Sequence, residues 1–143
     1  METRDRVCNV DIQLHSSIRH PGQDQETHEL SLTGQLIEKK GKSYLKYEEQ
    51  QSGNRILTTI KMGAEDALIL RSGAVTMRLP FIINGERPCT YGSGPATFDL
   101  LVKTTRLDFR EEARQFHVAY ELHADESLLG TYELTITYTG GTI

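Results

Sequence analysis

The sequence predicts an all-β domain, and an antiparallel up-and-down barrel is its simplest form. Apolar and polar residues alternate with a period of two along about nine stretches, and helical patterns are nearly absent. The stretches recur at roughly the 8–12-residue spacing of antiparallel sheets, with Gly or Asn in the turns between them. Because closure removes exposed sheet edges, strands with one apolar face favour a barrel, and a two-sheet sandwich is the alternative.

The first three predicted strands lie in the N-terminal third of the chain. Residues 8–14 alternate apolar and polar side chains, which indicates a strand with one dry and one wet face. The polar stretch 20–26 is expected to be a loop, and 28–36 resumes the alternation. The Lys-Lys-Gly-Lys sequence at 39–42 predicts a turn before the short strand 45–47.

Three further strands are predicted in the middle of the chain. The Ser-Gly-Asn turn at 52–54 leads into strand 56–62, and 67–70 forms the next one. Strand 75–83 ends at Asn84-Gly85, the strongest hairpin signal in the sequence because this pair readily adopts positive φ.

The last three predicted strands are 96–102, 116–122 and 128–138, in which apolar residues recur at every second position. Only residues 63–66 and 111–114 could form helical turns. Both are too short to be stable helices.

Composition restricts the class of protein. The chain has 143 residues, 16 Lys and Arg against 20 Asp and Glu, and a formal charge of −4, which indicates one mildly acidic domain without a nucleic-acid-binding face. Residues 1–6 carry alternating charges with no apolar segment behind them, and the apolar run 79–83 is far short of the ~20 residues that cross a bilayer. We therefore expect a cytoplasmic protein with no membrane association, in which Cys8 and Cys89 stay reduced.

Three motifs resemble the YwiB-like proteins of Bacillus and its relatives. They are Arg-Ser-Gly-Ala-Val-x-Met at 71–77, Leu-Leu-Val-Lys-Thr-Thr at 100–105 and Thr-Ile-Thr-Tyr-x-Gly-Gly-Thr at 135–142, and the likeness extends over nearly the whole chain. The resemblance implies a lipocalin-like (calycin) antiparallel up-and-down β-barrel of about eight to nine strands, with a central cavity or a packed interior. It implies no activity. Pro80 and Pro88 depart from the pattern and are expected to change local strand pairing.

Strand parity predicts a ligand site among the few polar residues that face inward. An arginine with tyrosine hydroxyls can hold a carboxylate or phosphate, because a desolvated guanidinium offers a planar pair of donors. The alternative is that the tyrosines are ordinary core residues and that the arginines lie in turns. The candidate ligand-binding residues are Tyr47, Arg71, Arg106, Tyr120 and Tyr132.

The sequence contains no pattern that predicts a metal, a cofactor or a catalytic group. The five histidines lack metal-ligand spacing and are expected to be solvated. Ser93 lies in a glycine-rich connection at 92–95 without the strand-turn-helix context of a nucleophile. Glu48 and Glu49 are adjacent, so on a strand they point to opposite faces, which disfavours a shared acid–base site.

Two functions agree with these observations, and neither is enzymatic. The first is non-catalytic binding of a small hydrophobic or anionic ligand in the barrel. The second is a protein–protein interaction module that uses the barrel exterior or a strand edge, by a monomer or a homodimer. The second is suggested by a polar ladder along the last strand, formed by Thr131, Glu133, Thr135 and Thr137.

Overall fold

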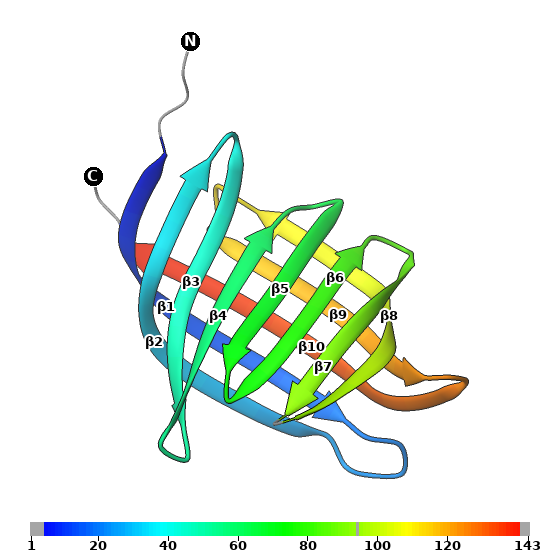
Figure 1. Ribbon diagram of the computed structural model, residues 1–143. Helices are drawn as coiled ribbons and strands as arrows, with labels where there is room; N and C mark the ends of the chain where they lie inside the picture. Colours follow the sequence, from blue (N-terminus) through cyan, green and yellow to red (C-terminus); the bar gives the residue numbers. More distant parts are fainter. Residues whose placement is uncertain (1–4, 94, 141–143) are drawn as a thin grey trace.

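The computed structural model describes residues 5–93 and 95–140, which form ten antiparallel strands (Figure 1). The strands are β1 (Arg6–Arg19), β2 (Glu26–Lys39), β3 (Lys42–Gln51), β4 (Asn54–Met62), β5 (Asp66–Gly73), β6 (Val75–Ile82), β7 (Glu86–Ser93), β8 (Ala96–Arg110), β9 (Gln115–Ala124) and β10 (Ser127–Gly140). No helix of membrane-spanning length and apolarity is found in these two ranges.

The sheet closes on itself as an up-and-down barrel. Every strand pairs with its neighbours in sequence, and β1 pairs with β10 to complete the ring. This last ladder runs from Val10 opposite Gly140 to Arg19 opposite Thr131. In Figure 1, β3–β7 form the near wall, and β8, β9, β10 and β1 cross behind them. The predicted closed antiparallel barrel is confirmed, and the sandwich alternative is wrong.

The barrel has ten strands, one more than the upper limit of the eight to nine that we predicted. The additional strand is β7, whose alternation is hidden by Pro88 and Gly92. Cys89 nevertheless points into the core with 2% exposure, and β7 pairs with β8 along its whole length. Strand pairing by its neighbours therefore overrides the weak intrinsic preference of this segment.

The ladder between β6 and β7 stops early, as the two prolines predict. Its last pair joins Arg78 and Thr90. Continuing the same register would place Pro80 directly opposite Pro88. Neither ring nitrogen has a hydrogen to donate to the facing strand, so no ladder can form between these two residues.

Three predicted turns adopt the left-handed backbone that tight hairpins need. Lys40 and Gly41 have φ of 52° and 75°, Ser52 and Gly53 have φ of 51° and 78°, and Asn84 has φ of 55°. Turns with positive φ match the twist of the strands that they join. These residues therefore set the register of three hairpins.

One continuous apolar cluster fills the centre of the barrel. The parity of β4 illustrates how it forms: Ile56 and Ile60 point inward and are fully buried, and Ile60 belongs to the cluster, whereas Leu57 between them is 45% exposed on the outer face. Every strand contributes side chains to the cluster in this way. The predicted assignment of one apolar parity to the inside is thus confirmed along the middle of the strands.

Core and surface positions on β4 should differ sharply in their effect on stability. We expect Ile60→Ala to lower the free energy of unfolding by about 2–5 kcal/mol, because it removes buried methyl groups and leaves a cavity. Leu57→Ala is the matched control and should change the free energy by less than about 1 kcal/mol. Urea unfolding followed by far-ultraviolet circular dichroism measures both values, and equal losses would contradict the assigned parity.

Candidate functional site

Four of the five predicted ligand residues come together toward one end of the barrel. We call it the tyrosine end, and it carries the turns at 20–25, 52–53 and 125–126. The register places Tyr47 opposite Thr58, and Thr58 opposite Arg71. Tyr47 and Thr58 are buried, and the Arg71 side chain keeps 24% exposure. Since directly opposed residues have Cβ atoms about 5 Å apart, the three side chains are neighbours.

The other two predicted tyrosines lie on the facing wall of the barrel. Tyr120 on β9 is opposite both Thr104 on β8 and Tyr132 on β10. The Tyr120 and Tyr132 rings are stacked, with centroids 5.1 Å apart and 9° between their planes. Phe81 packs on Tyr120 at 4.9 Å in a tilted arrangement. Packing on two rings holds Tyr120 in a single orientation.

Burial keeps the tyrosine hydroxyls of this region protonated. It raises the pKa of Tyr47 and of Tyr120 well above the ordinary value of a phenol, and it raises the pKa of Tyr132 in the same direction. The Glu49 carboxylate adds to the effect on Tyr47, whereas the Arg71 guanidinium opposes it on both Tyr47 and Tyr120. Arg71 therefore stands close to tyrosines of both walls, and the neutral phenols can donate hydrogen bonds at neutral pH.

Glu49 is the acidic member of this group. Its carboxylate lies 3.6 Å from the Arg71 guanidinium, and the two side chains are 18% and 24% exposed. Glu48 points outward and binds Arg55, so the adjacent glutamates face opposite sides as expected. The Thr104 hydroxyl is buried and has no hydrogen-bond partner among the residues described. The tyrosine–arginine cluster is Tyr47, Glu49, Arg71, Tyr120 and Tyr132.

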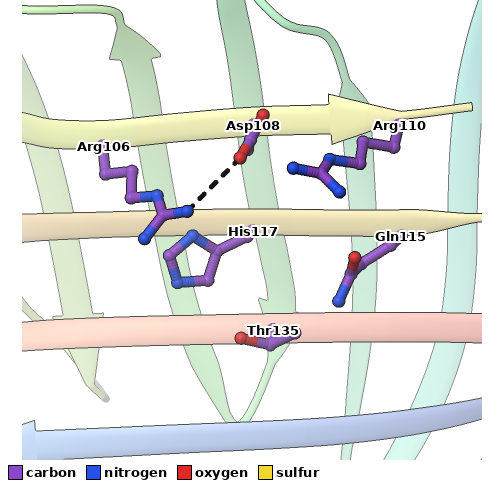
Figure 2. A pocket seen from close by; sticks show the side chains of 6 residues that line it. All are labelled: Arg106, Asp108, Arg110, Gln115, His117 and Thr135. Atoms are coloured by element: carbon purple, nitrogen blue, oxygen red, sulfur yellow. Dashed lines mark ion pairs between the residues drawn. The ribbon is translucent and has the colours of Figure 1, made fainter.

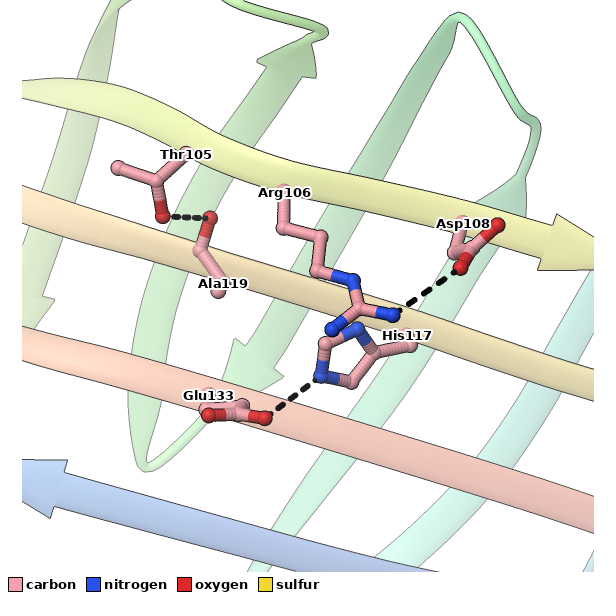
Figure 3. Close-up of polar contacts among 6 residues, drawn as sticks. All are labelled: Thr105, Arg106, Asp108, His117, Ala119 and Glu133. Atoms are coloured by element: carbon pink, nitrogen blue, oxygen red, sulfur yellow. Dashed lines mark hydrogen bonds and ion pairs between the residues drawn. The ribbon is translucent and has the colours of Figure 1, made fainter.

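Arg106 is the fifth predicted residue, and its predicted inward position is wrong. The register of β8 shifts between Thr104, which faces Tyr120, and Arg106, which faces Ala119. The extra residue, Thr105, donates a hydrogen bond to the carbonyl of Ala119 at 3.0 Å (Figure 3). A β-bulge of this kind reverses the parity of all later residues, and it leaves the Arg106 side chain 63% exposed.

A sequence signal for this bulge exists. The alternation of β8 changes parity after Thr104, because Leu107 and Phe109 take over the apolar positions. Leu107 is 6% exposed, which agrees with an inward position. A comparison of the two halves of the strand could therefore have located the bulge.

A small polar pocket of about 180 Å³ lies on the outer face of β8–β10, where Arg106 emerges (Figure 2). Asp108, His117 and Thr135 form one cross-strand row in it. The His117 Nε2 atom lies 2.8 Å from a carboxylate oxygen of Glu133 (Figure 3). The expectation that all histidines are solvated is wrong for His117, whose side chain is only 12% exposed. The outer pocket is lined by Arg106, Asp108, Arg110, Gln115, His117 and Thr135.

A second pocket, of about 380 Å³, lies at the opposite end of the barrel. Lys39 and Lys42 from the β2–β3 turn border it together with Arg6, Glu38 and Glu111. Both acidic and basic side chains line it, and most of them are exposed. This arrangement is typical of a solvated barrel rim.

The remaining predictions concern metals and the glycine-rich connection. Within the described residues, no three His, Cys, Asp or Glu side chains are grouped as metal ligands. Gly94 of the connection at 92–95 lies outside the described residues, as do Gly141 and Thr142 of the tail motif.

Comparison with known proteins identifies relatives along almost the whole chain. The profile of a family described as a domain of unknown function, DUF1934, matches residues 12–136. The chain is 31% identical over 135 residues to the uncharacterized beta-barrel protein YwiB of Bacillus subtilis, covering 93% of this chain and 94% of that one. The crystal structure of the ywiB protein from Bacillus subtilis superposes with a TM-score of 0.79 at 28% identity, covering 95% and 94% of the two chains. The resemblance inferred from the three motifs is confirmed.

The buried tyrosines should make the barrel sensitive to alkali. Phenols of the unfolded chain ionise near pH 10, whereas those of Tyr47 and Tyr120 ionise at a higher pH when folded. Their contribution to stability is therefore complete below about pH 10 and is lost as the pH rises above it. Thermal unfolding should show a steeper fall of Tm between about pH 9 and 11 for the wild type than for Tyr120→Phe.

Absorbance at 295 nm provides the direct measurement. In the native protein, part of the signal of the six tyrosines should appear only above about pH 11, whereas in urea all six should titrate near pH 10. Coincident native and denatured curves would contradict the burial of these phenols.

Proposed function

This chain belongs to the DUF1934 family of β-barrel proteins, and on that premise we propose that it binds a small amphipathic ligand at the tyrosine end without transforming it. The observation that carries the proposal is the placement of Arg71. Its guanidinium is largely withdrawn from solvent among protonated tyrosines and has one carboxylate contact, at 3.6 Å. A ligand with acceptor oxygens would accept hydrogen bonds from the donors of this group.

The balance of donors and acceptors favours an anionic head group. Arg71 carries five N–H donors, and the phenols of Tyr47, Tyr120 and Tyr132 add three more in their neutral form. Glu49 is the acidic side chain of the tyrosine–arginine cluster, and its distance from Arg71 is longer than a normal N–H···O bond. A carboxylate or phosphate at this end would gain charge-assisted hydrogen bonds to the guanidinium.

The rim of the tyrosine end suits an apolar ligand body. The cross-strand row of Arg71 continues through Met77 and Tyr91 to Phe98. Phe98 is 54% exposed, and Leu30 is 39% exposed. Apolar side chains at the mouth of a barrel next to a few polar groups are typical of small-molecule sites.

The second candidate function is docking of a protein partner on the outer face. Leu57 on β4 and Leu70 on β5 support it, because both are exposed and they stand in diagonal positions across the ladder. Size-exclusion chromatography with light scattering detects such a complex by its larger mass. Leu57→Lys should dissociate the complex and leave ligand binding unchanged, which distinguishes this candidate from the first. For either function we propose a cytoplasmic setting, which suits the free thiols of Cys8 and Cys89.

A matched pair of probes tests the ligand proposal. Octanoate and 1-octanol share an apolar body and differ in the anionic head, so octanoate should raise Tm more than octanol. Occupancy at 100 times Kd stabilises the native state by about 2.7 kcal/mol, which corresponds to several degrees for a chain of this size. Nucleotides and isoprenoid phosphates extend the screen to other anionic heads.

Variants of two arginines provide the control. Arg71→Gln should weaken octanoate binding about tenfold and abolish the advantage over octanol, because the charge-assisted bonds are lost. Arg78→Gln, on the outer face of the neighbouring strand, should leave both probes unaffected. The proposal is wrong if native mass spectrometry and thermal shift detect no ligand of any class, or if both variants behave alike.

A further inference from the structure

The outer pocket is a second site, separate from the tyrosine end and on the opposite side of the sheet. The bulge at Thr105 turns Arg106 onto this face, next to Asp108. Bulges are conspicuous near functional sites because they re-aim side chains. The pocket is carried by three paired strands, and it is lined entirely by polar and charged side chains.

Two arginines of β8 line the outer pocket. Figure 2 shows Arg106 extending from β8 toward His117 on β9 and Arg110 extending toward Asp108, which lies between the two arginines. Arg106 is paired with Asp108 at 3.5 Å, which is too long for a bidentate contact. Arg110 takes part in no ion pair or hydrogen bond within residues 5–93 and 95–140. Its donors therefore remain available.

Gln115 and Thr135 add further donors. Gln115 is opposite Arg110 across the ladder, and Thr135 is opposite His117. Neither side chain forms a hydrogen bond with another described residue. An amide NH₂ and a hydroxyl thus face the same pocket as the two guanidinium groups.

His117 is held at the centre of the pocket. Glu133 binds its Nε2 atom from β10 and fixes the plane of the ring. The Nδ1 atom is buried and has no hydrogen-bond partner in the part of the chain that is described. Because a carboxylate only accepts hydrogen bonds, Nε2 donates to Glu133 and Nδ1 of the neutral ring is an acceptor. Buried polar atoms are nearly always partnered, and a ligand with an O–H group, such as hydrogen phosphate, would donate to this nitrogen.

We propose that the outer pocket binds a small oxyanion, either a phosphate or a carboxylate. Donors outnumber acceptors, because the lining holds two arginines and a single carboxylate, that of Asp108, which is paired with Arg106. The neighbouring Glu133 is engaged by His117. An anion with several acceptor oxygens would bridge Arg106 and Arg110 and accept hydrogen bonds from Gln115 and Thr135. Because Arg106 is 63% exposed, binding should weaken as salt is added.

Nuclear magnetic resonance of the histidine rings tests this site without any assumption about activity. Inorganic phosphate and acetate are titrated separately into labelled protein at constant pH, and sodium chloride at matched ionic strength is the reference. We expect a saturable shift of the His117 ring signals and of the Gln115 side-chain amide. The other four histidines, His15, His20, His28 and His123, should not move.

Substitution of Arg110 tests whether the oxyanion binds at the outer pocket. Arg110→Gln should weaken oxyanion binding about tenfold, and Arg78→Gln, on the outer face of β6, should leave it unchanged. Saturation by phosphate but not acetate, or the reverse, identifies which oxyanion the site takes. A response equal to that of chloride, no saturation with either anion, or full binding by Arg110→Gln would overturn the proposal. Octanoate binding at the tyrosine end is measured in the same variants, so the two sites succeed or fail independently.

Discussion

The ladder between β1 and β10 is the interaction on which the rest of this structure depends. It converts a ten-stranded meander into a ring, so each interior strand edge has a hydrogen-bonded neighbour. Closure also gives every strand an unambiguous inside and outside, because the side-chain period of a strand is two. The apolar cluster and both candidate sites are consequences of that division. The inner parity builds the core and the tyrosine–arginine cluster, and the outer parity builds the pocket of β8–β10.

Two departures from regular strand pairing change which groups face one another. The bulge at Thr105 moves Arg106 from the inside to the outside, and so one added residue supplies a cation to the outer pocket. The ladder gap opposite Pro80 and Pro88 arises for a different reason, since both residues lack a backbone donor. In each case a local backbone constraint changes which groups face one another, while the ring itself is maintained.

The two proposed sites hold their arginines in different environments. Arg71 is partly withdrawn from water and is balanced by Glu49 and by phenols that burial keeps neutral. The arginines of the outer pocket remain close to solvent, where a charge keeps its hydration but its interactions are strongly screened by salt. We therefore expect anion binding at the inner cluster to depend less on salt concentration than anion binding at the outer pocket.

The sequence by itself determined the all-β class, the closed meander and the inner parity of most strands, because these follow from local alternation and from turn residues such as Asn84 and Gly41. It also placed Tyr47, Arg71, Tyr120 and Tyr132 on the inside. Only the tertiary structure showed that β7 is a strand and that Arg106 faces outward, because both depend on pairing with neighbours. The contacts of Glu49 with Arg71 and of His117 with Glu133 join residues on different strands. Periodicity within one strand does not determine the register between strands, and for that reason these contacts required the folded barrel.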